Sequence, residues 1–368
     1  MPSPLTHKPK YILIIRLSSL GDITHCLPVS YNLRKHYPQA RIAWLVRERY
    51  KELLEMEACL DEIVEIKNIS PRRLIARINE ICRIINLLRR KKFDIVLDLH
   101  CVLITNIISI FSGSPLKFGI DKKNELGLKV LKYSPLSKNK KIHRVNAYLS
   151  ILNLLGINTY EIKYNFVIPL KDSDRMFDLL KRYGHSSRKA VIAFHPGTAW
   201  EIKQWGIEKF AELSSILSIR YDTELVIIYG PKEKFFKQDK ITGLFSPKAK
   251  FITCSGIKEL AALLERCDLL IGNDSGPLHL AAALGIPTIS IFGPSNHFVS
   301  APFGDNHKII RKNISCSPCY GTFSVKFMCK HRDQKCLQLL SVEDVLEETE
   351  PIVTDIINAK REKTLSNK

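Results

Sequence analysis

Three short segments of the chain place carboxylates, a hydroxyl and a cation directly after predicted β-strands. Asp22 follows the first strand in RLSSLGDITH, Thr198 and Lys203 lie in FHPGTAWEIKQW, and Asp274 lies in GNDSGP. In open α/β sheets ligands bind beyond the carboxyl ends of the strands, so these side chains are candidates for chemistry. A carboxylate can accept a proton from an attacking hydroxyl, and a loop with a hydroxyl and a lysine can hold a phosphate. The spacing therefore predicts proton abstraction combined with phosphate binding.

Asp22 is the candidate general base. Gly21 lets the chain turn tightly, and Asp22 then opens a predicted helix over Ile23–Tyr37. The positive end of that helix would lower the pKa of the carboxyl group, so Asp22 would take up a proton only late in the reaction. Asp is also a favoured N-cap residue, and a purely capping role is the alternative. His25, one helical turn later, could orient Asp22, but we expect it to be a packing or surface residue.

The GNDSGP segment predicts an anion site at a helix N-terminus. Asp274 or Ser275 can cap the helix, and Gly276 allows a ligand to approach closely. Asp274 suits the hydroxyls of a sugar attached to the anion better than the anion itself. Glu233, which follows another strand in YGPKEK, is placed to accept hydrogen bonds from ribose hydroxyls. The alternatives are a capping aspartate, a solvated glutamate and, for Lys203, an exposed loop lysine.

The elements that position these residues alternate between strands and helices. Short Ile-, Val- and Leu-rich runs predict buried strands at Tyr11–Arg16, Ile42–Val46, Phe93–Leu99, Ala190–His195, Glu224–Tyr229, Lys250–Cys254, Asp268–Gly272 and Thr288–Phe292. Helical patterns lie between the strands. In Arg72–Leu88 an apolar stripe predicts a face buried against a sheet, made of Leu74, Ile78, Ile81, Ile85 and Leu88. Such alternation predicts parallel sheets covered on both faces.

We therefore expect two Rossmann-like, doubly wound α/β domains that face each other across a cleft. The alternation pauses at Ile168–Asp174 and restarts at Ala190, which predicts domains at 1–168 and 175–340. A C-terminal helix at 341–360 and a disordered basic tail at 361–368 should follow. No apolar run reaches the roughly 20 residues of a membrane helix, and no signal-peptide core precedes the first strand. A cytoplasmic protein is expected.

The formal net charge is +19, and most of the excess lies in the N-terminal half. Segment 71–92 holds eight basic residues and one acidic residue, and segment 117–144 holds nine and two, so each carries +7. Such patches concentrate a polyanion, which can be nucleic acid, an anionic membrane surface or a phosphorylated substrate. The alternative is a charge excess that only keeps the protein in solution.

Four of the ten cysteines are clustered near the C-terminus. Cys316, Cys319, Cys329 and Cys336 have the spacing C-x2-C-x9-C-x6-C, with His331 nearby. This spacing is suggestive of a zinc site, and a loop with free thiols or an occasional disulfide is the alternative. The sequence leaves both open. In a chain of this length without a signal peptide, most cysteines should be reduced.

Together, SSLGDxxH, HPGTxWxxKQW, GNDSGPLHLAAALGIP with IFGP, and CSPCY resemble glycosyltransferase family 9, the bacterial heptosyltransferases of lipopolysaccharide core synthesis. The resemblance covers Ile12 to Val345, and Asp274–His279 is its most specific part. It implies the glycosyltransferase B-type fold and a transfer of heptose, with inversion, from ADP-heptose to Kdo–lipid A or inner-core heptose. It also implies that the enzyme needs no cofactor and no catalytic metal.

The resemblance assigns roles to individual residues. Asp22 would be the catalytic base. The donor-binding residues would be Thr198, Lys203, Glu233, Asp274, Ser275, Gly276 and His279. Thr198 and Lys203 would hold the diphosphate, Glu233 the adenosine ribose and Asp274 the heptose hydroxyls. The phosphate contact could fall on the neighbours of Thr198, Gly197 or Ala199, instead.

The acceptor of this family is an anionic glycolipid, which should meet the basic N-terminal half. The acceptor-binding residues are expected to be Lys122, Lys123, Lys141, His143 and Arg144. We predict a peripheral enzyme that is held by charge at the cytoplasmic face of the inner membrane, without a spanning anchor.

Other function classes stay open. A nucleic-acid-binding protein would use the positive charge, but the basic segments lack interleaved aromatic residues and the strand-end motifs would be unexplained. A regulatory nucleotide sensor or a non-catalytic nucleotide-sugar-binding protein would share the fold. A related transferase could use another nucleotide sugar or acceptor. The absence of GxGxxG weakens a dehydrogenase interpretation.

Overall fold

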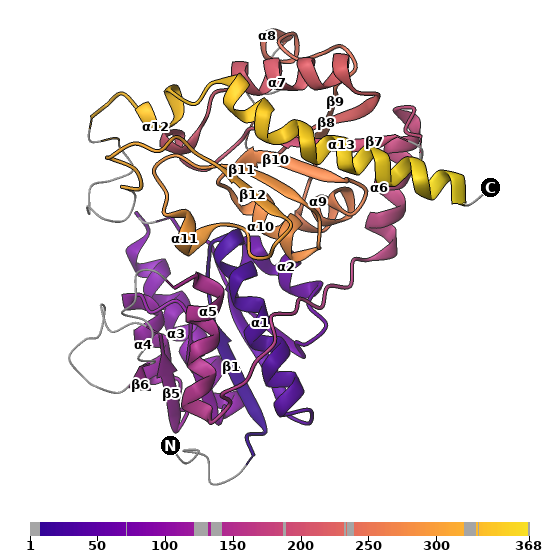
Figure 1. Cartoon of the computed structure of the whole chain (residues 1–368). Helices are drawn as coiled ribbons and strands as arrows, with labels where there is room; N and C mark the ends of the chain where they lie inside the picture. The colour runs from indigo at the N-terminus through magenta and orange to yellow at the C-terminus, as the bar shows by residue number, and fades with distance from the viewer. Residues whose placement is uncertain are drawn as a thin grey trace. The chain divides into compact units, whose positions relative to one another are not determined.

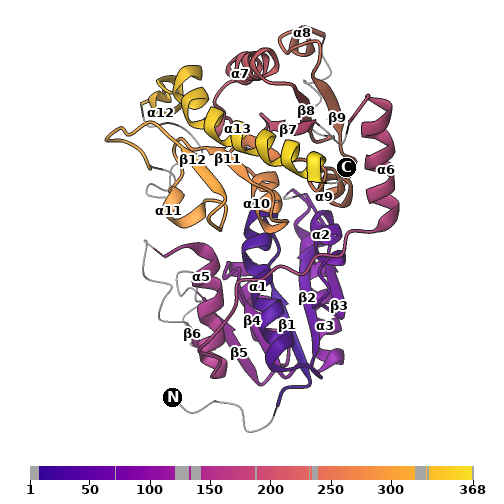
Figure 2. The same ribbon diagram turned by 45° about the vertical axis from the view of Figure 1, so that its right-hand side comes forward.

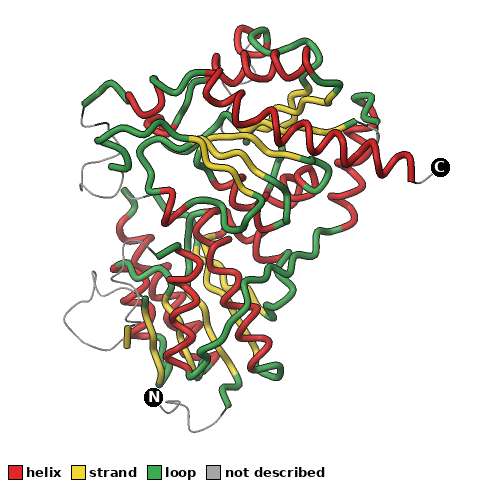
Figure 3. Tube along the Cα trace, viewed as in Figure 1, coloured by secondary structure: helices red, strands yellow, loops and turns green. Residues whose placement is uncertain are grey.

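The computed structural model describes residues 8–70, 72–120, 132–133, 142–186, 189–231, 233, 239–319, 329 and 331–366. The chain divides into two compact units, Met1–Val167 and Ile168–Lys368. In each unit, strands form a central sheet that helices cover on both faces (Figure 3). Within the described residues, no helix combines the length and the apolar character needed to cross a bilayer.

The N-terminal unit is built on a six-stranded sheet whose strand pairs are all parallel, in the order β3-β2-β1-β4-β5-β6. Its strands are β1 (Tyr11–Ile15), β2 (Arg41–Arg47), β3 (Glu62–Ile66), β4 (Ile95–Asp98), β5 (Leu116–Gly119) and β6 (Lys132–Tyr133). Its helices are α1 (Leu20–His36), α2 (Lys51–Glu55), α3 (Leu74–Lys91), α4 (Leu103–Phe111) and α5 (Arg144–Leu149). Helices α1 and α5 pack against each other (Figures 1 and 2), and α3 packs against α4.

The C-terminal unit repeats this plan with the strand order β12-β11-β10-β7-β8-β9, again all parallel. Its strands are β7 (Ala190–His195), β8 (Thr223–Tyr229), β9 (Lys250–Thr253), β10 (Leu269–Asn273), β11 (Thr288–Ile291) and β12 (His307–Ile310). Its helices are α6 (Leu170–Arg182), α7 (Ile207–Arg220), α8 (Asp239–Thr242), α9 (Ile257–Leu264), α10 (Gly276–Ala283), α11 (His297–Ser300), α12 (Lys335–Gln338) and α13 (Val342–Ser366).

Each sheet has one point where the strand order reverses. In the N-terminal unit β1, β2 and β3 run outward in one direction and β4, β5 and β6 in the other, so the reversal lies between β1 and β4. In the C-terminal unit it lies between β7 and β10. Loops leave such adjacent strands on opposite faces of the sheet and open a crevice at their carboxyl ends, which is where ligands bind in doubly wound sheets. The switch points are therefore the places to examine for function.

The predicted doubly wound α/β domains are confirmed, and every predicted strand is present. Strands β3, β5, β6 and β12 were not predicted. β3 reads EIVEI, in which glutamates interrupt the apolar run, and the other three have four residues or fewer. These strands lie toward the outer edges of their sheets, where burial is incomplete and the sequence signal is weak.

Two further predictions were wrong. The disordered tail expected from residue 361 is part of α13, which continues to Ser366 because KREKTLS holds strong helix formers and neither Gly nor Pro. The apolar stripe of α3 is not buried along its whole length, because Leu74 and Ile78 are exposed while Leu88 is fully buried.

Candidate active site

Asp22 lies at the switch point of the N-terminal sheet, with its carboxylate between two arginines. Its Oδ2 is 3.0 Å from Nη2 of Arg16, and its Oδ1 accepts a hydrogen bond from the guanidinium group of Arg144. Oδ2 also accepts hydrogen bonds from the hydroxyl of Ser19 at 2.9 Å and from its backbone N–H at 3.3 Å. Ser19 is the N-cap of α1, and Asp22 is the N3 residue of a capping box. Asp22 thus caps the helix and still points one oxygen toward Arg144.

The two arginines decide the charge state of Asp22. Burial alone would raise the pKa of this carboxyl group, but the positive charges of Arg16 and Arg144 hold the pKa well below its usual range. The charge of His25 and the hydrogen bond from Ser19 act in the same direction. The sequence suggested only the helix N-terminus as a cause. Asp22 is therefore ionised at neutral pH and is a weak base while both arginines contact it.

Arg16 is a site residue that the sequence analysis missed. It is buried at the end of β1, where Nη1 donates to the carbonyl oxygen of Leu99 at 2.8 Å and the guanidinium lies 5.3 Å from the ring centre of Tyr148. The backbone N–H of Leu17 donates to Nδ1 of His100 at 3.1 Å, and burial and the charge of Arg16 lower the pKa of His100 to about 3. The available signal was a cation that closes an otherwise apolar strand.

Of the five predicted acceptor residues, Arg144 contacts Asp22 and His143 contacts His25. Arg144 begins α5, and its side chain is 41% exposed, so it contacts both Asp22 and solvent. His143 is the N-cap of α5, and its ring centre lies 5.3 Å from that of His25, edge to face. Although they are far apart in the sequence, the two segments meet because α5 packs on α1 (Figure 2). Lys122, Lys123 and Lys141 lie outside the described residues.

The switch point of the C-terminal sheet holds a buried lysine–aspartate pair. Nζ of Lys203, from the loop after β7, lies 2.7 Å from Oδ2 of Asp274, which directly follows β10. Nε2 of His279, on α10, lies 3.9 Å from the other carboxylate oxygen. Burial would raise the pKa of Asp274, but its interactions with His279 and with the charge of Lys203 hold the pKa well below its usual range. The predicted phosphate-binding and sugar-binding residues are thus in direct contact.

Ser275 caps α10 and connects it to β7. Its hydroxyl lies 3.2 Å from Nδ1 of His195, a buried residue whose pKa is lowered by burial. Nε2 of His195 lies 4.0 Å from Oε2 of Glu233. Gly272 is required here, because a Cβ at this position would lie 2.7 Å from the carbonyl oxygen of His195. His195 is a second residue that the sequence analysis missed.

Glu233 lies directly over the loop that was predicted to hold phosphate. Its carboxylate accepts a hydrogen bond from the backbone N–H of Gly230 at 2.6 Å. A Cβ at Gly197 would lie 1.8 Å from Oε1 of Glu233, so any larger residue here would force this carboxylate to move. Thr198 follows Gly197 and is half-buried. The predicted donor-binding residues therefore gather around the carboxyl ends of β7, β8 and β10.

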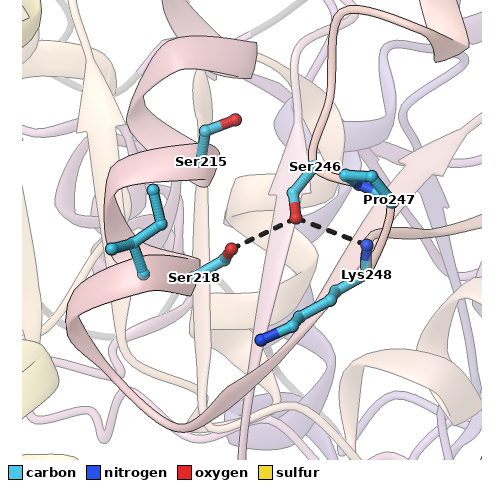
Figure 4. A pocket seen from close by; sticks show the side chains of 6 residues that line it. Ser215, Ser218, Ser246, Pro247 and Lys248 are labelled. Atoms are coloured by element: carbon cyan, nitrogen blue, oxygen red, sulfur yellow. Dashed lines mark hydrogen bonds between the residues drawn. The ribbon is translucent and has the colours of Figure 1, made fainter.

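Among the described residues, the C-terminal cysteines do not form a metal site. In that part of the chain, which includes Cys316, Cys319, Cys329 and Cys336, no three His, Cys, Asp or Glu side chains are placed to hold a metal ion. A pocket of about 540 Å³ is lined by Ser215, Ser218, Ile219, Ser246, Pro247 and Lys248 (Figure 4). No predicted site residue lines this pocket, so the candidate site rests on the two switch points.

Comparison of the sequence with known proteins shows the family of this chain. Residues 81–326 match the family model of glycosyltransferase family 9 (heptosyltransferase). The lipopolysaccharide core heptosyltransferase OpsX of Haemophilus influenzae is 24% identical over 312 residues, which cover 83% of this chain and 85% of that protein.

Solved structures agree on the fold. The glycosyl transferase family 9 protein of Veillonella parvula is 25% identical, with a TM-score of 0.78 over 94% of this chain and 97% of that one. Escherichia coli heptosyltransferase WaaC, solved with ADP-2-deoxy-2-fluoro heptose, is 18% identical, with a TM-score of 0.70 over 93% and 99%. These likenesses confirm the predicted fold class, two doubly wound domains of the glycosyltransferase B type. The chain belongs to glycosyltransferase family 9, the heptosyltransferases.

Proposed function

We propose that this chain transfers heptose from ADP-heptose to the inner core of lipopolysaccharide, either to Kdo–lipid A or to an inner-core heptose, with inversion at the anomeric carbon. The observation that carries the proposal is the different chemistry of the two switch points. One holds a carboxylate between two arginines, and the other holds a lysine–aspartate pair beside a helix N-terminus. The arginines of the first can bind an anionic acceptor and its carboxylate can take up the acceptor's proton. The cation and the helix N-terminus of the second can stabilise a diphosphate leaving group.

Asp22 is the proposed base, and Arg144 controls its basicity. The acceptor hydroxyl attacks the anomeric carbon of heptose, the bond from that carbon to the diphosphate oxygen breaks, and the hydroxyl proton passes to Asp22. An anionic group of the acceptor competes for Arg144, whose side chain is partly exposed. When Arg144 turns to the acceptor, Asp22 loses one of the cationic partners that lower its pKa, and that pKa rises. Acceptor binding thereby makes the carboxylate a better base.

Lys203 and α10 are proposed to stabilise the ADP that leaves. Lys203 carries a positive charge and three N–H donors next to Asp274, so the proposal assigns it to the oxygens of the diphosphate. The N-terminus of α10 adds backbone N–H groups and a positive partial charge. Asp274 and His279 lie beside them and are proposed to bind the heptose, while Glu233 binds the adenosine ribose.

We expect Gly197→Ala to weaken ADP binding by roughly tenfold or more, because the new methyl group must displace the Glu233 carboxylate. Isothermal titration with ADP measures this. Gly230→Ala is the matched control, since a Cβ there would lie 3.5 Å from the same carboxylate, an ordinary contact. Equal affinities for both variants would contradict the placement of the nucleotide over this loop.

We propose that the reaction needs no metal ion, with Lys203 and the N-terminus of α10 providing the positive charge that a metal supplies in other transferases. EDTA treatment is then expected to leave turnover essentially unchanged. Turnover is measured before and after dialysis against EDTA, and then with added Mg²⁺ or Mn²⁺. Strong inhibition that either ion reverses would contradict the proposal.

The reaction itself is tested by mass spectrometry of the products from ADP-heptose, with Kdo–lipid A and heptosylated core offered as rival acceptors. The mass of one added heptose on either acceptor supports the proposal and identifies the acceptor. Binding of ADP-heptose without transfer to either would favour a nucleotide-sugar-binding protein.

We place the enzyme at the cytoplasmic face of the inner membrane as a peripheral protein, because its proposed acceptor is a membrane lipid and its N-terminal half is basic.

A further inference from the structure

The first two turns of α3 expose aliphatic side chains that have no place in the core. Leu74 is 62% exposed, Ile75 76% and Ile78 49%. The part of α3 that packs in the core of the N-terminal unit comes later, at Ile84 and Leu88. The helix therefore extends beyond the sheet it covers, and an apolar patch of three adjacent large side chains stays in contact with water. Adjacent exposed apolar side chains of this kind are typical of a surface that binds a protein, a membrane or a ligand.

Arginines surround this patch. Arg72 and Arg73 are exposed directly before α3, and Arg77 is exposed within its first turns. Arg47 is the last residue of β2, and Arg49 follows this strand. Burial and the charges of Arg49 and Arg77 lower the pKa of Arg47, so these cations lie near one another. The segment from Lys67 to Asn79 contains no acidic residue.

Among the described residues, no carboxylate pairs with Arg47, Arg49, Arg72, Arg73 or Arg77. Several other cations of the N-terminal unit have such a partner: Arg34 pairs with Asp61, Arg41 with Glu62, Lys51 with Glu65, Arg83 with Glu80 and Lys91 with Glu62. The positive charge around the aliphatic patch is therefore not neutralised by ion pairs.

The patch lies at the same edge of the sheet as Asp22. Helix α3 starts beyond the carboxyl end of β3, as α1 starts beyond that of β1, and the two strands are parallel. Leu103, the first residue of α4, is 54% exposed at this edge, and α4 packs beside α3 (Figure 1). The charges of both Arg47 and Asp22 act on His100, which connects the arginines to the candidate active site.

We propose that the first two turns of α3 dock the N-terminal unit on an anionic lipid bilayer, with Leu74, Ile75 and Ile78 inserted among the acyl chains and Arg72, Arg73 and Arg77 on the lipid phosphates. An aliphatic patch surrounded by arginines matches the interface of a bilayer, which is apolar inside and anionic at its surface. A nucleic acid would use the arginines and leave the aliphatic side chains without a partner. The inference deepens the proposed function, since it rests on an acceptor that is a membrane lipid and says how Asp22 is brought to it.

The test compares binding of the full chain to vesicles of phosphatidylcholine with and without phosphatidylglycerol. The wild type is expected to bind only the anionic vesicles, and less at high salt. The variant Leu74→Ser/Ile75→Ser/Ile78→Ser should lose about tenfold or more in partitioning. Arg72→Gln/Arg73→Gln/Arg77→Gln should lose a similar amount. The matched control is Val167→Ser/Leu170→Ser/Ile219→Ser, which removes three aliphatic side chains that are at least as exposed and should bind like the wild type.

Insertion is tested separately with Ile75→Trp. Its fluorescence above the wild-type background is expected to shift to the blue and to be quenched by brominated acyl chains, while that of the control Ile219→Trp stays unchanged. Unchanged vesicle binding of the triple serine variant, or an unquenched Trp at position 75, would overturn the proposal. A dimer in solution that buries the apolar patch would overturn the proposal as well. Light scattering of the wild type and the triple serine variant would detect such a dimer.

Failure of this inference can be separated from failure of the proposed function. Transfer to a water-soluble, deacylated acceptor should be the same in the triple serine variant and the wild type, while transfer to acceptor embedded in vesicles should fall. If the wild type transfers to neither acceptor, the proposed function fails, and the vesicle-binding and quenching results still decide on the docking surface.

Discussion

Replacement of Asp22 with asparagine is expected to lower kcat by about 10²- to 10⁴-fold, the range that general-base catalysis contributes. Asparagine keeps an oxygen for the capping hydrogen bonds from Ser19 but cannot take up the acceptor proton. It also leaves Arg16 and Arg144 without their carboxylate, so the N-terminal unit should lose about 2–3 kcal/mol of stability. The affinity for ADP, measured by titration, should not change, because the proposed donor site lies in the other unit.

The control for this variant is Asp61→Asn, which also breaks an aspartate–arginine pair of the N-terminal unit, at a more exposed position. It should leave kcat near the wild-type value. If Asp22→Asn retained near-wild-type kcat, Asp22 would be only a capping residue.

The pH dependence of stability gives a further check on Asp22. A carboxyl group whose pKa is lowered by folding stabilises the protein above its unfolded pKa of about 3.9, and this stabilisation is lost as the pH falls toward the folded pKa. Urea denaturation at a series of acidic pH values should therefore show a shallower loss of stability for Asp22→Asn than for the wild type. Parallel curves would mean that the arginines do not hold the carboxylate as the structure shows.

Replacement of Lys203 with methionine is the second large change, and we expect kcat to fall by about 10²- to 10³-fold together with donor affinity. Lys203 is proposed to stabilise the leaving diphosphate, and it also compensates the buried Asp274. Breaking a buried ion pair from one side costs about 3–5 kcal/mol, so the variant should unfold at a lower temperature. Steady-state kinetics and calorimetry measure the two effects.

A double variant separates these two roles of Lys203. Lys203→Met/Asp274→Asn has no uncompensated charge at this position, so it should regain most of the lost stability and remain inactive. Recovery of turnover in the double variant would show that Lys203 acts only by neutralising Asp274. Unchanged donor affinity in the single variant would place the diphosphate elsewhere.

Local sequence patterns predicted those features of the fold that depend on burial alone. The strands at the centre of each sheet were found because they are buried on both faces and therefore consist of unbroken apolar runs. The same rule missed β3, where glutamates alternate with apolar residues. It also misplaced the first turns of α3, because a helical period shows which face is apolar and not how far the sheet beneath it extends.

The candidate site was predicted as a set of loops, and its internal contacts were not. Asp22, Lys203 and Asp274 were found because each follows a strand. The ion pair between Asp22 and Arg144 joins residues 122 positions apart, and it exists because α5 packs on α1. Arg16 and His195 were missed because each stands at the end of a buried strand, where a single polar residue usually has no role in a site.

The self-contained switch points have a consequence for how such enzymes diversify. Arg16 and Arg144, which form ion pairs with Asp22, lie before residue 168, while Asp274 and His195, which lie next to Lys203 and Glu233, come after it. Recombination of two related genes at this junction would leave these contacts intact. With the proposed acceptor site in the first unit and the proposed donor site in the second, a chimaera joined near Val167 should combine the acceptor of one enzyme with the nucleotide sugar of the other.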